Sequence, residues 1–186
     1  MKQRYVLAVI FCAVAAVVGY NMYFSLTPAT HADHDHGLAN LDAGGFLRLE
    51  REDGGKRNLV GRPEKVLVLH WFTPDSPEAA AEVPALLEYA ASVREDAGIE
   101  VVLVASRSEW PAVREFADRM GAPMGMVYRD ATGRTGDLFG VRRIPETLIY
   151  DPNGRLAHQA RGLADWASAG FRAGIEAFKQ GVEEVH

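Results

Sequence analysis

Apolar and polar positions divide the chain into three parts. Residues 1–26 carry a long apolar run, from Tyr5 through Leu26, that begins after two positive charges. Residues 27–45 are small, polar and without apolar periodicity, which is typical of a linker. Residues 46–186 alternate between short β-branched runs and longer amphipathic stretches, and this alternation predicts a single α/β domain.

Short apolar runs in residues 46–186 predict strands and hairpins. Two turn signals, Asp53-Gly54-Gly55 and Asp151-Pro152-Asn153-Gly154, each separate a pair of such runs, and the second fits a type I turn. The runs KVLVLHW and IEVVLVA are apolar nearly throughout, which favours buried central strands. The predicted strands cover residues 46–50, 56–60, 65–71, 99–105, 126–128, 146–150 and 155–161.

The strongest helix signal follows the strand at residues 65–71. Ser76 is a preferred N-cap, Pro77 suits the first helical position, and Glu78 adds a negative charge to the first turn. A helix is therefore expected over residues 77–96, with Gly98 ending it.

Three further helical segments are expected later in the chain. Ser108 can cap a helix that runs to residue 120 and stops at Gly121, and a short helical turn is expected over residues 135–139. Asp165 can cap a last helix. Its apolar stripe would consist of Trp166, Phe171, Ile175 and Phe178.

The apolar run of residues 1–26 has the length of a membrane-spanning helix. Such a helix needs about 20 apolar residues, whereas the apolar region of a signal peptide usually has about 7–15. After Arg4 the next positive charge is Arg48, so the positive-inside bias places the N-terminus in the cytoplasm. We expect a single-pass anchor in a bacterial inner membrane, with the domain facing the periplasm. The alternative is a signal peptide cleaved near Thr30-His31-Ala32.

Composition excludes several classes of function. The formal net charge is −5 and no Lys/Arg-rich run is present, so nucleic acid is not an expected partner. Glycine motifs for nucleotide phosphates are also absent from the sequence. Cys12 is the one cysteine, which rules out an internal disulfide, a C-x-x-C pair and a thiolate metal cluster.

Several landmarks between residues 46 and 178 together resemble one family. A strand ends in Leu69-His70-Trp71-Phe72, the next helix contains Ala81-Glu82-Val83-Pro84, and Ile144-Pro145-Glu146-Thr147 precedes the last hairpin. In this order they resemble the membrane-anchored thioredoxins of the TlpA/ResA type, within the redoxin superfamily. The resemblance implies a thioredoxin-like α/β fold, in which helices flank a mixed central sheet with an N-terminal β-hairpin. It also implies an N-terminal transmembrane helix and a cis peptide bond before Pro145.

The resemblance places the two redox cysteines of this family at Ser76 and Ala79. Thiol–disulfide exchange needs a thiolate to attack sulfur and a second thiol to resolve the mixed disulfide. A serine hydroxyl and an alanine methyl supply neither, so we expect no catalytic residue here and interpret Ser76 as an N-cap. A serine nucleophile is the alternative, with His70 or Glu82 as its base. Phe72-Thr73-Pro74 also resembles the loop of the related peroxiredoxins, which equally depend on a cysteine.

A polypeptide-binding groove is a further implication of the resemblance. In the family, the strand at the cis proline presents its backbone to an extended substrate polypeptide. The implied groove residues here are Trp71, Phe72, Ser76, Pro77, Glu82, Ile144 and Pro145. Glu82 has two interpretations. Since Glu is usually a surface residue, we expect a partly exposed helix carboxylate, and a retained functional acid is the alternative.

The linker contains His31, His34 and His36, which are residues of the type that binds Cu or Zn. A metal site needs fixed ligand geometry, which a polar linker does not provide, so we expect a solvated linker and no cofactor. A copper or zinc chaperone that uses these three histidines, with His70 as a further ligand, is the alternative.

Two classes of function follow from the sequence. The first is a non-catalytic binding or assembly module that holds a polypeptide or a membrane complex, linked to cytochrome or redox-protein biogenesis. The second is an oxidoreductase by fold whose chemistry depends on unfamiliar residues. We expect the first, because Ser76 and Ala79 stand at the cysteine positions.

Overall fold

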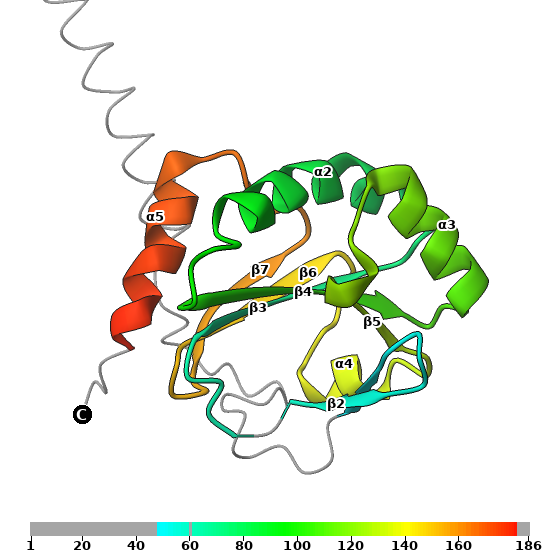
Figure 1. The fold of residues 1–186 in the computed structure, drawn as a ribbon, viewed down its shortest axis with the longest axis horizontal. Coiled ribbons are helices and arrows are strands. Elements are labelled where there is room, and N and C mark those ends of the chain that lie inside the picture. The colour runs from blue at the N-terminus through cyan, green and yellow to red at the C-terminus, as the bar shows by residue number, and fades with distance from the viewer. Residues whose placement is uncertain (1–47, 60, 182–186) are drawn as a thin grey trace, which may run out of the picture.

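A computed structural model describes residues 48–59 and 61–181. They form a seven-stranded sheet of order β2-β1-β5-β4-β3-β6-β7 (Figure 1). The strands are β1 (Arg48–Glu50), β2 (Lys56–Asn58), β3 (Val66–Phe72), β4 (Ile99–Ser106), β5 (Val127–Asp130), β6 (Glu146–Tyr150) and β7 (Leu156–Arg161). The helices are α2 (Pro77–Ser92), α3 (Trp110–Met120), α4 (Arg134–Leu138) and α5 (Ala169–Ala177), with short 3-10 helices at Met124–Met126 and Phe178–Gln180.

The sheet is mixed, as predicted. β3, β4 and β5 are parallel neighbours, whereas β6 runs antiparallel to β3 and β7 runs antiparallel to β6. All seven residues of β3 are buried, which confirms the central strand that its apolar run predicted. The hairpin of β1 and β2 pairs with the edge of this core through β5. The structure thus confirms the mixed α/β sheet and the N-terminal hairpin.

Two apolar layers enclose the sheet. On one face, residues of β3 and β4 pack against α2, α3 and α5, with Phe116, Trp166 and Ile175 among the buried side chains. On the other face, Trp71 packs with Phe139, which directly follows α4, in a smaller cluster. Figure 1 shows α2 and α3 on one side of the sheet and α4 on the other.

The predicted end of the first long helix is wrong by four residues. α2 ends at Ser92, whose hydroxyl donates a 2.7 Å hydrogen bond to the Tyr89 carbonyl, and Val93 then turns into the core. The Asp96 carboxylate accepts a hydrogen bond from the Gly98 N–H and closes a turn before β4. Side chains that bond to backbone groups therefore end the helix before Gly98 does.

Two predicted caps are also wrong. The Ser108 hydroxyl donates to the Ser106 carbonyl, so α3 begins after Glu109 instead. Ser168, not Asp165, is the N-cap of α5, because its hydroxyl accepts a hydrogen bond from the Phe171 N–H. In the first case the expected serine makes another backbone hydrogen bond, and in the second a serine three residues later in the chain takes the capping position.

The strand expected at residues 126–128 is shifted, since Met126 ends a 3-10 helix and β5 spans Val127–Asp130. The anchor expected at residues 1–26 and the linker at 27–45 lie outside the described residues. Within residues 48–59 and 61–181, none of the helices is both long and apolar enough to cross a membrane.

Candidate functional site

The start of α2 and the cis-proline segment meet at one end of the sheet. Trp71 of β3 pairs with Glu146 of β6, and continuing this antiparallel register brings Phe72 beside Pro145. The Ile144–Pro145 peptide bond is cis, as the resemblance implied. Four residues after Phe72, Ser76 caps α2. The fold therefore brings two landmarks that are far apart in the sequence to the carboxyl end of β3.

Ser76 has the geometry of an N-cap. Its Oγ accepts a 3.0 Å hydrogen bond from the Ala79 N–H and donates a 3.0 Å hydrogen bond to Glu78. Ala79 is fully buried in the core. No hydrogen bond from Ser76 to His70 or Glu82 occurs in the described part of the chain. This geometry fits the interpretation of Ser76 as a cap, and it brings neither of the two predicted bases, His70 and Glu82, to the Ser76 hydroxyl.

Replacing Ser76 with alanine should lower the free energy of unfolding by about 1 kcal/mol, because the Ala79 N–H loses its acceptor. Ser76→Asp should retain most of the stability, since its carboxylate can accept the same bond and a helix N-terminus favours negative charge. Urea unfolding of the three proteins measures the difference. An alanine variant as stable as the native chain would show that the cap contributes little.

The seven predicted groove residues differ in their access to solvent. Trp71 and Phe72 are buried in the two opposite apolar layers, so neither side chain faces the exterior. Pro77 is exposed, and Ser76 and Ile144 are partly exposed. Any ligand at this end of the sheet would therefore contact the start of α2 and the segment before Pro145, while Trp71 and Phe72 support them from below. The groove itself stays a prediction.

Glu82 is not the partly exposed carboxylate that was expected. It is 4% exposed, and its Oε1 accepts hydrogen bonds from the Ala164 N–H at 2.9 Å and the Trp166 Nε1–H at 2.8 Å. Burial raises the pKa of Glu82, although these two hydrogen bonds act in the opposite direction. The expectation failed because the segment after β7 folds over this face of α2, which local sequence does not reveal.

His70 lies in the same buried layer as Glu82. Its Nδ1 is 3.0 Å from the Thr147 hydroxyl, and its ring is 6.4 Å from that of Trp166 in an edge-to-face arrangement. Burial lowers the pKa of His70 to about 3, so the ring is neutral at physiological pH. Within the described residues, His70 Nε2, Glu82 Oε2 and the Tyr89 hydroxyl have no hydrogen-bond partner. We call His70, Glu82, Tyr89, Thr147 and Trp166 the buried polar cluster.

Sequence reasoning missed part of this cluster. It considered His70 as a base or metal ligand and Glu82 as a base, a groove residue or a functional acid, but it did not place the two together. It also assigned Trp166 to the stripe of a helix that in fact begins later. One available signal was a histidine at an inward-facing position of an otherwise apolar strand, because such a side chain needs a polar partner.

Glu146 is a second functional candidate that the sequence did not single out. Its carboxylate is fully buried and accepts hydrogen bonds from the N–H groups of Arg142 and Arg143, at 2.8 and 3.2 Å, and from the Gln159 side chain. Arg161 lies 3.4 Å from the same carboxylate. Glu146 therefore ties the segment before the cis proline to β7 and holds its backbone in place.

The described residues contain no group of three His, Cys, Asp or Glu side chains that could hold a metal ion. His31, His34 and His36 lie outside those residues, so copper or zinc binding by the linker stays a prediction. The site that the structure does describe combines a helix N-terminus, a buried carboxylate and a neutral imidazole. The helix N-terminus is accessible at Ser76 and Pro77, whereas the carboxylate and the imidazole are buried, and none of these groups contains sulfur.

Solved structures establish the same fold in several bacterial proteins. DsbF of Mycobacterium tuberculosis is 23% identical with a TM-score of 0.63, over 77% of this chain and 99% of that one. A putative thiol:disulfide interchange protein DsbE from Chlorobium tepidum is 21% identical with a TM-score of 0.65, over 76% and 99%. StoA from Bacillus subtilis is 15% identical with a TM-score of 0.58, over 71% and 98%. These likenesses confirm the thioredoxin-like fold.

A comparison with the curated proteins found no match. The model of the AhpC/TSA family matches residues 46–159, which cover both the start of α2 and the cis-proline segment. This match spans more than half of the chain and agrees with the redoxin-type fold. The chain therefore belongs to the AhpC/TSA family.

Proposed function

We propose that this chain is a non-catalytic redoxin module that binds an extended polypeptide at the start of α2, on the extracytoplasmic side of a bacterial inner membrane. One observation carries the proposal: α2 begins with a capping serine at Ser76 and a buried Ala79. These are the two positions at which the resemblance to TlpA/ResA-type proteins places the redox cysteines. The helix start is retained in geometry while the thiols are replaced.

Thiol–disulfide exchange is not expected at this site, because neither Ser76 nor Ala79 has a thiol. A helix N-terminus lowers the pKa of a cysteine thiol and so prepares a thiolate, but it cannot make a serine hydroxyl attack sulfur productively. The one cysteine of the sequence, Cys12, belongs to the apolar N-terminal run. The neighbours in the structural comparison include proteins called thiol:disulfide interchange proteins, and this chain would share their surface without their reaction.

The segment before Pro145 supports polypeptide binding. The Glu146 carboxylate accepts hydrogen bonds from the backbone N–H groups of Arg142 and Arg143. The Pro145 carbonyl accepts a hydrogen bond from the Gly162 N–H. Ile144 lies between Arg143 and Pro145, and its backbone makes no such hydrogen bond within the described residues. A rigid segment with an available backbone unit is suited to pairing with an extended chain.

The cellular location rests on the N-terminal part of the sequence. An apolar run of spanning length, preceded by Lys2 and Arg4, favours a domain outside the cytoplasm. An extracytoplasmic position would also give the module access to polypeptides that have just crossed the membrane.

An insulin-reduction assay tests the missing chemistry. We expect the full-length chain to add no rate to the reduction of insulin disulfides by dithiothreitol, and the Ser76→Cys/Ala79→Cys variant to accelerate it. Ser76→Cys alone is the control, because it lacks a resolving thiol. Acceleration by the native chain would refute the proposal, and an inert double variant would show that these positions are not equivalent to the thiols.

A separate NMR titration tests polypeptide binding. A panel of unstructured peptides should perturb the amide resonances of Ile144 and Ser76 and leave Gly154, at the far end of β6, unchanged. If no peptide in the panel moves the first two resonances, binding at this site is contradicted even when the insulin assay gives the expected result.

A further inference from the structure

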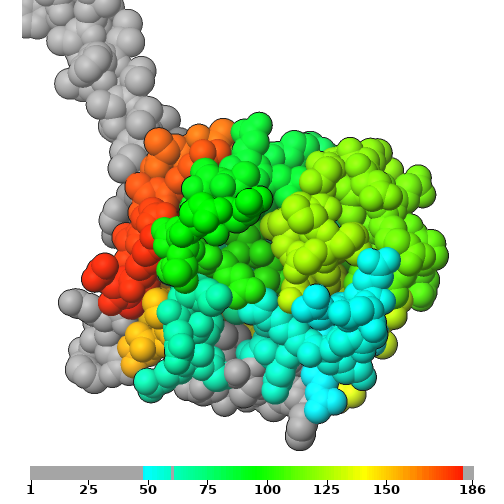
Figure 2. Space-filling view, in the orientation of Figure 1, coloured from blue at the N-terminus to red at the C-terminus, as the bar shows by residue number. Residues whose placement is uncertain are grey.

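A cavity opens on the surface at the other end of α2. It has a volume of about 420 Å³ and lies between the C-terminal half of α2, the first residues of β4 and the segment 121–126. In the space-filling view, the green surface of α2 and the yellow-green surface of that segment flank a recess (Figure 2). This volume falls within the range of small-molecule sites, which is roughly 300–1,000 Å³.

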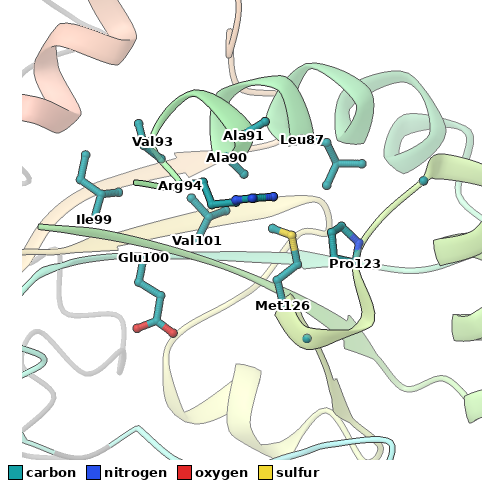
Figure 3. A pocket seen from close by; sticks show the side chains of 12 residues that line it. Leu87, Ala90, Ala91, Val93, Arg94, Ile99, Glu100, Val101, Pro123 and Met126 are labelled. Atoms are coloured by element: carbon teal, nitrogen blue, oxygen red, sulfur yellow. The ribbon is translucent and has the colours of Figure 1, made fainter. Parts of the chain in front are cut away.

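The apolar core reaches the surface at this cavity. Val93, Ile99 and Val101 keep 7–9% exposure, whereas Val66 and Val68 of the same cluster have none. Figure 3 shows the cavity lined by side chains from all three elements. The apolar ones include Leu87, Ala90, Val93, Ile99, Val101 and Met126. An unbranched methionine adapts well to the shape of a bound apolar group.

Two of the lining residues, Arg94 and Glu100, carry a charge, and they point in different directions (Figure 3). The Arg94 side chain extends along α2 across the cavity. The Glu100 carboxylate points away from α2, because side chains alternate along β4, and it pairs with Arg57 and with Lys65 at 3.3 Å. Of these two charged groups, the Arg94 guanidinium is therefore the one available to a ligand at the mouth of the cavity.

Arg94 is able to change partner. Its ion pair is with the adjacent Glu95 at 3.5 Å, and the two side chains are 81% and 93% exposed. Ion pairs as exposed as this one contribute little to stability, so a ligand carboxylate can replace Glu95 at small cost. A guanidinium offers a carboxylate two parallel hydrogen bonds, which an ammonium does not.

From this combination we infer that the cavity binds a single-chain aliphatic carboxylate of the fatty-acid type. The aliphatic chain lies among Leu87, Ala90, Val101 and Met126, and the carboxylate contacts the Arg94 guanidinium at the mouth. Each methylene that leaves water should raise the affinity about fourfold, so affinity should increase with chain length until the cavity is full. An aliphatic cation is disfavoured by Arg94, and an alcohol lacks the charge that Arg94 would pair with.

Methyl NMR of the full-length chain in nanodiscs of deuterated lipid tests the inference. Octanoate should shift the Met126 and Leu87 methyl resonances saturably, and 1-octanol should bind about fivefold more weakly, because it forms no charged pair. A site-specific resonance separates binding in the cavity from partition into the lipid. Equal affinities for octanoate and octanol would mean apolar binding alone and would overturn the inference, as would unmoved methyl groups.

Variants of Arg94 provide the second arm. Arg94→Gln should weaken octanoate binding to the level of octanol and leave octanol binding unchanged, whereas Arg94→Lys should retain part of the preference for octanoate. Arg114→Gln, which removes an exposed arginine from α3, is the matched control and should have no effect. Unchanged octanoate affinity in Arg94→Gln would contradict the role given to Arg94. These results do not depend on polypeptide binding at Ser76.

Discussion

Replacing Trp166 with alanine is expected to lower the free energy of unfolding by about 3–5 kcal/mol, as for other large buried aromatic side chains. Trp166 is 1% exposed and packs against Tyr89 and Phe171, with ring centroids 5.6 and 5.1 Å away. The substitution would leave a cavity between α2 and α5. It would also remove the indole donor from Glu82, a carboxylate that is already short of partners.

Trp166→Phe separates these two contributions. It keeps an aromatic ring between Tyr89 and Phe171 and removes the Nε1–H together with part of the indole volume, so we expect a loss of about 1–3 kcal/mol, smaller than for alanine. The pKa of Glu82 should rise further in this variant, because the indole hydrogen bond favours the charged form.

Urea unfolding followed by circular dichroism measures these losses. Trp110→Ala is the control, since Trp110 is only partly buried at the start of α3, and it should cost less than Trp166→Ala. If Trp166→Ala and Trp110→Ala destabilise the domain equally, the buried polar cluster does not tie the segment after β7 to α2.

Acid should destabilise the domain through His70. Burial lowers the pKa of His70 in the folded state to about 3, from 6.5 in an exposed chain. Below pH 6.5 the unfolded chain therefore takes up a proton that the folded domain does not, and stability falls as pH falls. The slope for one such group approaches about 1.4 kcal/mol per pH unit and continues toward the folded pKa. Above pH 6.5 the ring is neutral in both states and has no effect.

Glu82 acts with the opposite sign. Its folded pKa is raised, so the folded domain binds the proton more readily than the unfolded chain, and stability is lost as pH rises through the folded pKa. His158, whose pKa is also lowered by burial, acts in the same sense as His70. The pH dependence of the native domain is therefore a sum of these effects, and only a difference between variants isolates one group.

The comparison is between the native chain and His70→Leu, with urea unfolding measured from pH 7.5 to pH 4.5. The difference in stability should be constant above pH 6.5 and should shift in favour of His70→Leu below it. His158→Leu is the matched control for a second buried histidine, and Glu82→Gln should reverse the sign of the change. Parallel curves for the native chain and His70→Leu would contradict the neutral, buried state of His70.

The features that could be predicted from the sequence depend on contacts within a few residues along the chain. The Asp151-Pro152-Asn153-Gly154 turn forms as expected, with the Asp151 side chain accepting hydrogen bonds from the N–H groups of Asn153 and Arg155. The Ser76 cap and the cis bond before Pro145 also agree with expectation, the second through the resemblance. Helix ends were less predictable, because Ser92 and Ser108 each had several backbone partners within reach.

The sequence by itself determined where the strands lie along the chain and that no C-x-x-C pair is present, because apolar periodicity and residue identity are local properties. Tertiary structure alone decided that Glu82 is buried under Trp166, that His70 meets Thr147 across β3 and β6, and that Arg94 lies over an apolar cavity. Each of these contacts joins segments that are distant along the chain. Burial and charge at such contacts depend on which segment covers which face of the sheet, and only the packed domain specifies that.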